Sequence, residues 1–460
     1  MGIAFLILYN LLAPIIALAY FIFFLFSSRR GLLKHLLAEL KERFAVSVPV
    51  FLERPLWFHA ASVGEVKAIQ QLVPLVRARF PLKPVMITTS TSSGRTEALK
   101  LTPCQSTGQA PHAFLLPLDS YPLMRRFMAA ARPELLLIAE TELWPNLLYA
   151  AGHSGVKVMM INARISPRTA GFYELFAPIA RLMFRNISRI AVQSRDDFER
   201  YKALLGGTDK LALTGNMKHD LVVPKPQDRA EIESFLERAE WKGKRIFCAG
   251  STHPEEENII LEAFLKIRAA LPDARLILAP RHPETAASSA VLLREKGLVA
   301  PRWSQRAHAR PALLAEGVNR GQHLGDKPQS ESQKGGAWSG PDCLLVDEIG
   351  RLADIYGFSD VVFVGGTLDE TGGHNVLEPS AFSKPVLFGP NIKHTRDGAE
   401  ALINKNGGFM VGTADELADK IISLLKDPVA LREAGAASKA ALESLQGATA
   451  KTLALIEKYL

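Results

Sequence analysis

Short apolar runs alternate with helical patterns along this chain, and that alternation restricts its fold more than any other feature. In the first half the runs fall at residues 56–59, 85–89, 135–139, 156–161 and 190–193. Loops and stretches of helical pattern separate them. Runs of this kind predict βαβ units around a parallel sheet. The expected fold class is therefore α/β, with doubly wound, Rossmann-like sheets.

A second series of the same kind follows a polar stretch that contains Pro224 and Pro226. We expect two Rossmann-like domains, at residues 29–217 and 218–460, because 460 residues exceed one ordinary core. Ligands of such sheets bind outside the carboxyl ends of the strands, so the cleft between two facing domains is the expected site. The apolar runs of the second series are 245–249, 276–279, 343–346, 361–364, 385–388 and 408–411.

The N-terminal segment is unusually apolar. Residues 2–26 carry no charge, and Arg29, Arg30 and Lys34 follow them. A helix of that length would reach about 37 Å, whereas a hydrocarbon core measures about 30 Å. We therefore predict a single transmembrane anchor within residues 1–28, with the rest of the chain on the cytoplasmic side. A cleaved signal peptide and a buried core helix are the alternatives.

Charge and cysteine content narrow the functional class. The net charge of +8 suits an anionic partner, such as a phosphorylated substrate, a nucleic acid or an acidic membrane surface. Cys104, Cys248 and Cys343 are far apart, which excludes a disulfide scaffold and a zinc ribbon. Residues 305–342 are polar and aperiodic, and we interpret them as a flexible insertion in the second domain.

Two loops of the first half carry groups suited to catalysis. Ser62, Gly64 and Glu65 follow a strand and enter a helix. Glu65 is either a general base or an acid that favours the helix N-terminus. Residues 88–95 are rich in hydroxyls and end in Arg95, so they can hold a phosphate or simply cap a helix. No Walker motif occurs in the chain.

Glu140 and Glu142 follow another apolar run, and buried carboxylates in such a place need partners or a function. No histidine at ligand spacing completes a metal site there. Arg164 and Lys218 each lie in a loop after a strand-like run. They either attract an acidic substrate or belong to the solvated surface.

The second half carries candidate nucleotide-binding groups. Ser251 belongs to a strong helix-start signal whose hydroxyls and amides can also take a phosphate. Arg281 sits at the tip of the next strand. Glycines follow the run at 361–364, and Asn375 and Glu378 come shortly after them. The spacing predicts that Asn375 and Glu378 share one helix face, where a glutamate can accept both hydroxyls of a ribose.

In combination, these motifs resemble the 3-deoxy-D-manno-octulosonic acid (Kdo) transferases, glycosyltransferase family 30. The resemblance extends from the N-terminal segment to about Lys393. Two departures are the long insertion at 305–342 and His219, where the family usually has phenylalanine. The segments that carry the resemblance read F-H-A-A-S-V-G-E, T-T-S-T-S-S-G, E-T-E-L-W-P-N, N-A-R-I-S, G-N-M-K-H-D, A-G-S-T-H-P-E-E-E, P-R-H-P-E and G-G-H-N-V-L-E-P.

The resemblance implies a GT-B fold and an inverting transfer of Kdo from CMP-Kdo to the lipid A precursor at the inner membrane. Glu65 matches the general base, and Glu140 and Lys218 match transition-state stabilisers. No metal or cofactor is expected, and nucleic acid is not an expected partner. Ser62, Gly64, Ser251, Arg95 and Arg164 are further candidates for phosphate or acceptor contacts. The positions that match CMP-binding residues are Pro280, Arg281, Ile349, Gly350, Arg351, Asn375, Val376, Leu377 and Glu378.

Three alternatives remain open from the residues alone. A lipid-linked glycosyltransferase with a UDP donor would keep the fold and change the sugar. A sugar-nucleotide epimerase would share the fold, although the predicted anchor argues against it. A membrane-tethered binding module without catalysis would not need Glu65, Glu140, Lys218 and Arg281 together.

Overall fold

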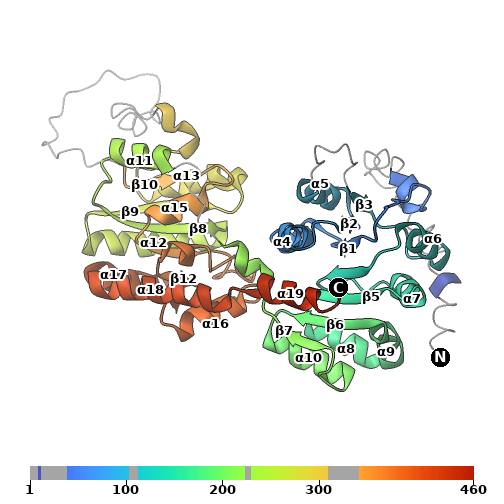
Figure 1. Cartoon of the computed structure of the whole chain (residues 1–460). Helices are drawn as coiled ribbons and strands as arrows, with labels where there is room; N and C mark the ends of the chain where they lie inside the picture. The colour runs from blue at the N-terminus through green and yellow to red at the C-terminus, as the bar shows by residue number, and fades with distance from the viewer. Residues whose placement is uncertain (1–8, 12–38, 103–111, 223–228, 309–340) are drawn as a thin grey trace, which may run out of the picture. The chain divides into compact units, whose positions relative to one another are not determined.

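The computed structural model describes residues 9–11, 39–102, 112–222, 229–308 and 341–460. The chain divides into two compact units. Unit 1 comprises Met1–Leu221 and Gln446–Leu460, and unit 2 comprises Val222–Leu445. Each unit contains a parallel sheet flanked by helices (Figure 1), as the alternating sequence pattern predicts.

Unit 1 is built on a seven-stranded sheet in the order β3-β2-β1-β4-β5-β6-β7. Its strands are buried and almost wholly apolar, because helices cover both faces of the sheet. Trp57 of the first strand points into one core, while Leu56 and Phe58 point into the core on the opposite face. The strands are β1 (Leu56–His59), β2 (Val85–Thr89), β3 (Ala113–Leu115), β4 (Leu135–Ala139), β5 (Lys157–Ala163), β6 (Ile187–Val192) and β7 (Leu211–Leu213).

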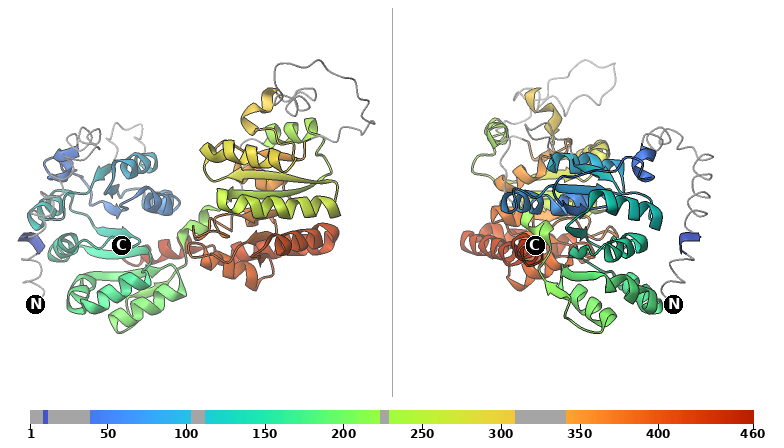
Figure 2. Two further views of the ribbon diagram at one scale, coloured as in Figure 1. Left: turned by 180° about the vertical axis from the view of Figure 1, so that it is seen from behind. Right: turned by 45° about the vertical axis from the view of Figure 1, so that its right-hand side comes forward.

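The helices of unit 1 lie on both faces of this sheet (Figure 2). Several begin at a serine or threonine whose hydroxyl accepts a backbone N–H of the first turn, as at Ser62, Thr91 and Ser194. One face carries α3 (Val63–Ile69), α4 (Leu72–Arg79), α5 (Ser92–Leu101) and α19 (Ala448–Glu457). The other carries α6 (Tyr121–Ala131), α7 (Pro145–His153), α8 (Pro167–Leu175), α9 (Ala177–Arg185) and α10 (Arg195–Leu205).

Unit 2 has a six-stranded sheet in the order β10-β9-β8-β11-β12-β13. Its core also lies on both faces, because Phe247 and Cys248 of the first strand enter different clusters. The strands are β8 (Arg245–Thr252), β9 (Ala274–Pro280), β10 (Cys343–Leu345), β11 (Val361–Val364), β12 (Val386–Phe388) and β13 (Gly408–Met410). The α-helices are α11 (Arg229–Arg238), α12 (Pro254–Ala270), α13 (Ala286–Glu295), α15 (Leu352–Phe358), α16 (Arg396–Asn404), α17 (Ala414–Lys426) and α18 (Pro428–Leu445).

The last residues of the chain belong to unit 1, which differs from the predicted second domain of 218–460. Two features hold α19 there. Its apolar residues Ala448 and Ile456 enter the core beside α4. Asp220, in the 3₁₀ helix η1 (Met217–Leu221), accepts the backbone N–H groups of Gly447 at 2.7 Å and Thr449 at 2.6 Å. This cap comes from a residue far away in sequence, so local helix signals do not reveal it.

We expect Asp220→Ala to loosen α19 while the sheet of unit 1 stays folded. The change removes the acceptor of two backbone N–H groups, which costs about 1–3 kcal/mol. Amide hydrogen exchange in α19 should accelerate by about 5- to 150-fold, the same free energy expressed as a rate ratio. Asp196→Ala, which removes an exposed carboxylate on α10, is the matched control. Unchanged exchange in α19 would contradict the proposed cap.

The predicted anchor lies almost wholly outside the described residues. Among the residues that are described, no helix is long and apolar enough to cross a membrane. Tyr9 and Asn10 are described, and they make polar contacts with unit 1. The Tyr9 hydroxyl donates to Asp119 at 3.1 Å, and the Asn10 amide donates to Asn146 at 2.8 Å. Polar contacts therefore hold this part of the N-terminal segment against unit 1.

The predicted insertion at 305–342 lies mostly outside the described residues, but its two ends belong to unit 2. Residues Trp303–His308 form the 3₁₀ helix η3, and the indole of Trp303 is fully buried. Asp342, at the other end, pairs with Arg268 at 3.0 Å. The polar composition of these ends did not show that they pack against the domain.

Candidate active site

Each sheet reverses its strand order beside its first strand, between β1 and β4 in unit 1 and between β8 and β11 in unit 2. Such a reversal opens a crevice at the carboxyl ends of the two strands, where ligands of doubly wound folds bind. Glu65 follows β1 and Glu140 follows β4. The sequence-predicted catalytic residues Glu65 and Glu140 therefore lie where the strand order reverses. We call this place the switch point of the sheet.

Glu65 is held in place by the loop that leads into α3. Its carboxylate accepts the backbone N–H of Ala61 at 2.6 Å and the hydroxyl of Ser62 at 3.2 Å. Ser62 is also the N-cap of α3, and its hydroxyl accepts the backbone N–H of Glu65 at 3.4 Å. These contacts between the loop and the first turn of α3 fix the carboxylate near the carboxyl end of β1.

Burial raises the pKa of Glu65 from its ordinary value of 4.5 to about 7. The neighbouring charges of Glu142 and Glu140 raise it further, while the hydrogen bonds from Ala61 and Ser62 lower it. A carboxylate whose pKa lies near neutral pH is suited to general-base catalysis, because it is both available and basic enough to accept a proton. The alternative, an acid that only stabilises the helix N-terminus, does not account for this burial beside two further carboxylates.

Glu140 lies at the centre of an ion-pair cluster. Its carboxylate contacts the Lys218 ammonium at 2.6 Å and the Arg164 guanidinium at 3.0 Å. The residue is only 5% exposed and adopts a left-handed backbone conformation, with φ of +56°. A non-glycine residue in that conformation carries strain, which typically occurs at functional sites. The structure thus brings together three sequence-predicted residues that are far apart in the chain.

Lys218 is positioned by two asparagines that the sequence analysis did not assign to the site. The side-chain oxygen of Asn216 accepts the backbone N–H of Lys218 at 3.0 Å. The side-chain oxygen of the buried Asn162, whose φ is +51°, accepts the backbone N–H of Met217 at 2.9 Å. The Lys218 side chain remains 40% exposed. It can therefore reach a ligand while it stays paired with Glu140.

Glu142 is a further acid beside Glu65. Its carboxylate accepts the indole N–H of Trp144 at 3.0 Å, and burial raises its pKa. The sequence left the choice between Glu140 and Glu142 to the family resemblance. The structure distinguishes them, because Glu140 carries the two cations and Glu142 has an indole partner.

Two further residues of unit 1, Arg95 and Gly64, are predicted to contact phosphate or the acceptor. Arg95, on α5, pairs with Glu42 at 3.0 Å. Gly64 lies in the first turn of α3, and a Cβ atom there would meet the Ser62 hydroxyl oxygen at an ordinary contact distance of 3.9 Å. The assignments of Ser62, Gly64, Arg95 and Arg164 to phosphate or acceptor binding stay predictions.

The predicted CMP-binding residues of unit 2 follow the carboxyl ends of β9, β10 and β11. Pro280 ends β9, and the exposed Arg281 comes next. Burial raises the pKa of Glu378, and the charge of Arg281 acts in the opposite direction. The side-chain amide of Asn375 donates to the Glu378 carboxylate at 3.3 Å. Arg281, Asn375 and Glu378 therefore belong to one neighbourhood.

The prediction of a helix that contains both Asn375 and Glu378 is wrong. Residues Val376, Leu377 and Glu378 form a turn, and only the short 3₁₀ helix η4 (Pro379–Phe382) follows. The turn keeps the side chains of Asn375 and Glu378 in contact. Pro379 restricts the backbone at this point, which favours a turn over a regular α-helix.

A tight turn carries Ile349, Gly350 and Arg351 after β10. Ile349 is 81% exposed, and Gly350 has a φ of +88°, which favours glycine. Arg351 pairs with Glu348 at 3.4 Å and with Glu231 at 3.8 Å. Ser251, after β8, also has a left-handed backbone, with φ of +56°. The ligand contacts assigned to these residues stay predictions.

Glu256 is a site feature that the sequence analysis did not assign. Its fully buried carboxylate accepts the backbone N–H groups of Gly366 at 2.6 Å, Thr367 at 3.0 Å and Leu368 at 2.8 Å. It also accepts the N–H of His253 at 3.1 Å. One side chain thereby joins the start of α12 to the glycine-rich loop after β11. Nothing in the local sequence pattern links these two segments.

We expect Glu256→Gln to destabilise unit 2. The new amide group would direct N–H donors at N–H donors, which leaves buried polar groups unsatisfied at a cost of about 1–3 kcal/mol. Urea unfolding should therefore show a lower midpoint for this variant than for Glu262→Gln, which alters an exposed acid on the same helix. Equal midpoints for the two variants would contradict the role assigned to Glu256.

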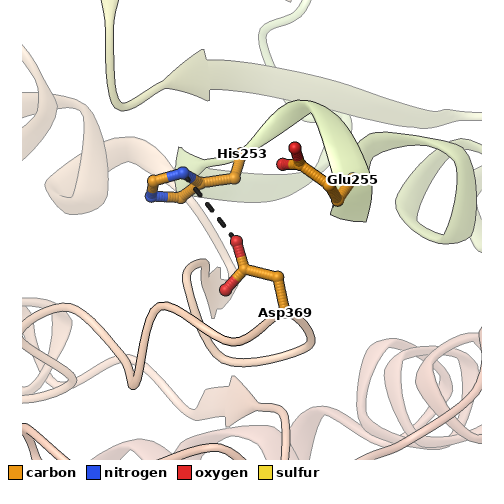
Figure 3. A group of neighbouring side chains, drawn as sticks. All are labelled: His253, Glu255 and Asp369. Atoms are coloured by element: carbon orange, nitrogen blue, oxygen red, sulfur yellow. Dashed lines mark ion pairs between the residues drawn. The ribbon is translucent and has the colours of Figure 1, made fainter.

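His253, Glu255 and Asp369 form a group that could hold a metal ion, because one ligand atom from each lies within 4.8 Å of the others. Figure 3 shows their side chains, with the imidazole of His253 directed at Asp369 across 3.8 Å. The Asp369 carboxylate already accepts the N–H and the hydroxyl of Thr371, at 2.9 and 2.8 Å. Glu255 is exposed at the start of α12. The group therefore has the donor types for a divalent cation, but its best-placed carboxylate is already engaged.

Comparison with known proteins identifies the family. A family profile described as 3-deoxy-D-manno-octulosonic-acid transferase (kdotransferase) matches residues 38–221. The 3-deoxy-D-manno-octulosonic acid transferase of Haemophilus influenzae is 34% identical over 88% of this chain and 87% of its own length. That of Bordetella pertussis is 30% identical over 91% of this chain and 90% of its own.

Solved structures match the fold across both units. The UDP-GlcNAc 2-epimerase of Neisseria meningitidis, solved with UDP-GlcNAc, covers 88% of this chain and 100% of its own with a TM-score of 0.55. At 12% identity, this likeness shows the GT-B-like pair of Rossmann-like domains and nothing more. The relatives matched by sequence decide between the activities that share this fold. The chain belongs to the 3-deoxy-D-manno-octulosonic acid (Kdo) transferase family.

Proposed function

We propose that this chain is an inverting glycosyltransferase that moves Kdo from CMP-Kdo to the lipid A precursor during lipopolysaccharide synthesis. The observation that carries the proposal is that a candidate base and a candidate cation lie at the switch point of unit 1. A carboxylate with a pKa of about 7, Glu65, lies at the same switch point as the Glu140–Lys218 ion pair. A base and a cation are the two groups that transfer of an acidic sugar requires.

In the proposed reaction, Glu65 takes the proton from a hydroxyl of the acceptor. The hydroxyl oxygen attacks the anomeric carbon of Kdo, and CMP leaves with the electrons of the broken C–O bond. One direct displacement inverts the anomeric centre and needs one base. Lys218 stabilises the sugar carboxylate or the departing phosphate, and Glu140 orients Lys218 through the 2.6 Å ion pair.

Unit 2 is proposed to bind the donor. Arg281 supplies a guanidinium for the phosphate of CMP, and Glu378 supplies a carboxylate for the ribose hydroxyls. The backbone amides of the loop after β11 are not all free for this purpose, because Glu256 accepts those of Gly366, Thr367 and Leu368. The phosphate charge is met by side-chain cations, so we propose that transfer needs no metal and no other cofactor.

The membrane location is part of the proposal. The uncharged segment at 2–26 and the basic residues after it suit a single N-terminal anchor at the inner membrane, with the catalytic units on the cytoplasmic face. A lipid acceptor that cannot leave the bilayer and carries phosphates suits an enzyme with a net charge of +8.

A transfer assay in detergent tests this function. Purified full-length protein is mixed with CMP-Kdo generated in situ and a tetraacyl lipid A precursor in the presence of EDTA, and the product is followed by mass. We expect mass gains in whole Kdo units, whose number reports how many residues are added. UDP-sugars offered with the same acceptor serve as control donors. Binding of CMP without product, or transfer from a UDP-sugar instead, would contradict the proposal.

A further inference from the structure

Two histidines meet at the switch point of unit 2, where none of the predicted site residues supplies an imidazole. His253 follows β8, and His374 lies in the loop after β11, next to Asn375. Their Nε2 atoms are 2.9 Å apart, and their rings are stacked within 6° of parallel. His282, next to Arg281, lies edge-on to His253 with ring centroids 5.9 Å apart. The loops after β8, β9 and β11 thus each contribute a histidine.

The contact between two Nε2 atoms has a chemical consequence. A hydrogen bond at 2.9 Å needs one donor and one acceptor, so one of the two nitrogens carries the proton and the other does not. Burial lowers the pKa of His374 to about 4, and the charges of His253 and Arg281 lower it further. In the absence of a ligand each imidazole therefore satisfies one ring nitrogen of the other.

Two features beside the pair attract an anion. The N-terminus of the long helix α12 begins directly after His253, and its dipole attracts negative charge. Arg281 adds a full positive charge, which acts on both His374 and Glu378. The charged and titratable groups that face the pair are Arg281, His282, Asp369, Glu255 and Glu256.

Two of those acids are already engaged. Glu256 is occupied by the backbone N–H groups of the glycine-rich loop, and Asp369 accepts both donors of Thr371. Their oxygens are therefore partly occupied, although Asp369 still lies 3.8 Å from His253 and its charge still acts on His374. Arg281, the cation next to the pair, remains available for a ligand, since it is exposed at the tip of β9.

We propose that His253 and His374 bind the phosphate of the nucleotide donor, together with Arg281, and exchange their mutual hydrogen bond for contacts with that anion. The inference rests on the proposed function and adds two binding residues to it. His253 and His374 follow β8 and β11, the two strands at which the strand order of unit 2 reverses. Ligands of doubly wound sheets bind at such a place, and Glu65 and Glu140 occupy the corresponding place in unit 1. The competing interpretation is a divalent cation held by His253, Glu255 and Asp369 (Figure 3).

Calorimetric titration with CMP and with cytidine separates phosphate recognition from a structural effect. The variants are His253→Asn, which retains a favourable N-cap for α12, and His374→Asn. His394→Asn, an exposed histidine of the same unit, is the matched control. Each titration is made in EDTA and again with added Mn²⁺, and thermal melting of each variant checks its fold.

We expect each variant to weaken CMP binding by about 10- to 150-fold, the size of a hydrogen bond to a charged group, and to leave cytidine binding unchanged. His394→Asn should bind both ligands as the wild type does. Unchanged CMP affinity, or an equal loss for CMP and cytidine, would overturn the inference and leave the transferase function intact. CMP binding that requires Mn²⁺ would overturn it in favour of the cation site. A wild type that does not bind CMP would instead contradict the proposed donor, and with it the inference.

Discussion

The Glu65→Gln variant is expected to bind donor and acceptor normally and to transfer Kdo about 10²- to 10⁴-fold more slowly than the wild type. That range is the usual contribution of a positioned general base. The amide keeps the size of the side chain, and its oxygen can still accept the N–H of Ala61, but it cannot take a proton. The measurement is kcat under saturating donor and acceptor. Glu199→Gln, which alters an exposed acid of unit 1, should retain full activity.

The same variant should be more stable than the wild type, and most of all at high pH. The folded-state pKa of Glu65, about 7, is above its ordinary value of 4.5. The stability associated with this raised pKa is fully present below about pH 4.5 and is lost as the pH rises through about 7. Glu65→Gln does not ionise. It should therefore melt above the wild type at pH 8.5, with a smaller difference at pH 5. A variant that is inactive and less stable at both pH values has simply lost its fold.

Lys218→Met is expected to lower kcat by about 10²- to 10³-fold, the effect of removing one group that stabilises developing charge. Methionine preserves much of the aliphatic volume and removes the ammonium. Arg164 would remain within 3.0 Å of Glu140, so the carboxylate would keep a partner and the protein should fold. Lys202→Met, which removes the lysine of the exposed Glu199–Lys202 pair, is the matched control and should be fully active.

The ion pair predicts how Lys218→Met combines with Glu140→Gln. If Glu140 acts by orienting Lys218, the double variant should have a kcat only slightly lower than that of Lys218→Met alone. If the fold-losses of kcat in the two single variants multiply in the double variant, the two residues act independently, which would contradict the orienting role. Because Glu140 is nearly buried, Glu140→Gln also leaves two cations without their counter-charge. Its melting temperature must therefore be measured beside its activity.

Much of the fold follows from the sequence for a simple physical reason. Parallel strands covered on both faces are continuous apolar runs, and all six strands of unit 2 appeared as such runs. The short edge strands β3 and β7 of unit 1 were not among them, because three residues carry little periodic signal. The docking of α19 was also missed. Its cap, Asp220, lies more than two hundred residues away in the chain.

The sequence predicted those site residues that follow a strand. It did not predict those that act through contacts between two loops distant in sequence. Glu140 stands out because a charge directly after a buried strand must reach the carboxyl edge of the sheet. Glu65 stands out because it enters a helix soon after such a strand. Asn162, Glu256 and the His253–His374 pair act through contacts between segments that the sequence does not relate. Their residue types are ordinary in loops and helix starts, so composition gives no signal for them.

The pH dependence of kcat/KM for Kdo transfer tests the central claim most directly, because that claim assigns the acceptor proton to Glu65. Between pH 5 and 9 the wild-type rate should rise tenfold per pH unit and level off through a single ionisation near pH 7. The residual rate of Glu65→Gln should not show this ionisation. A Glu65→Gln enzyme that keeps the wild-type rate, or the wild-type ionisation, would show that another group takes the proton.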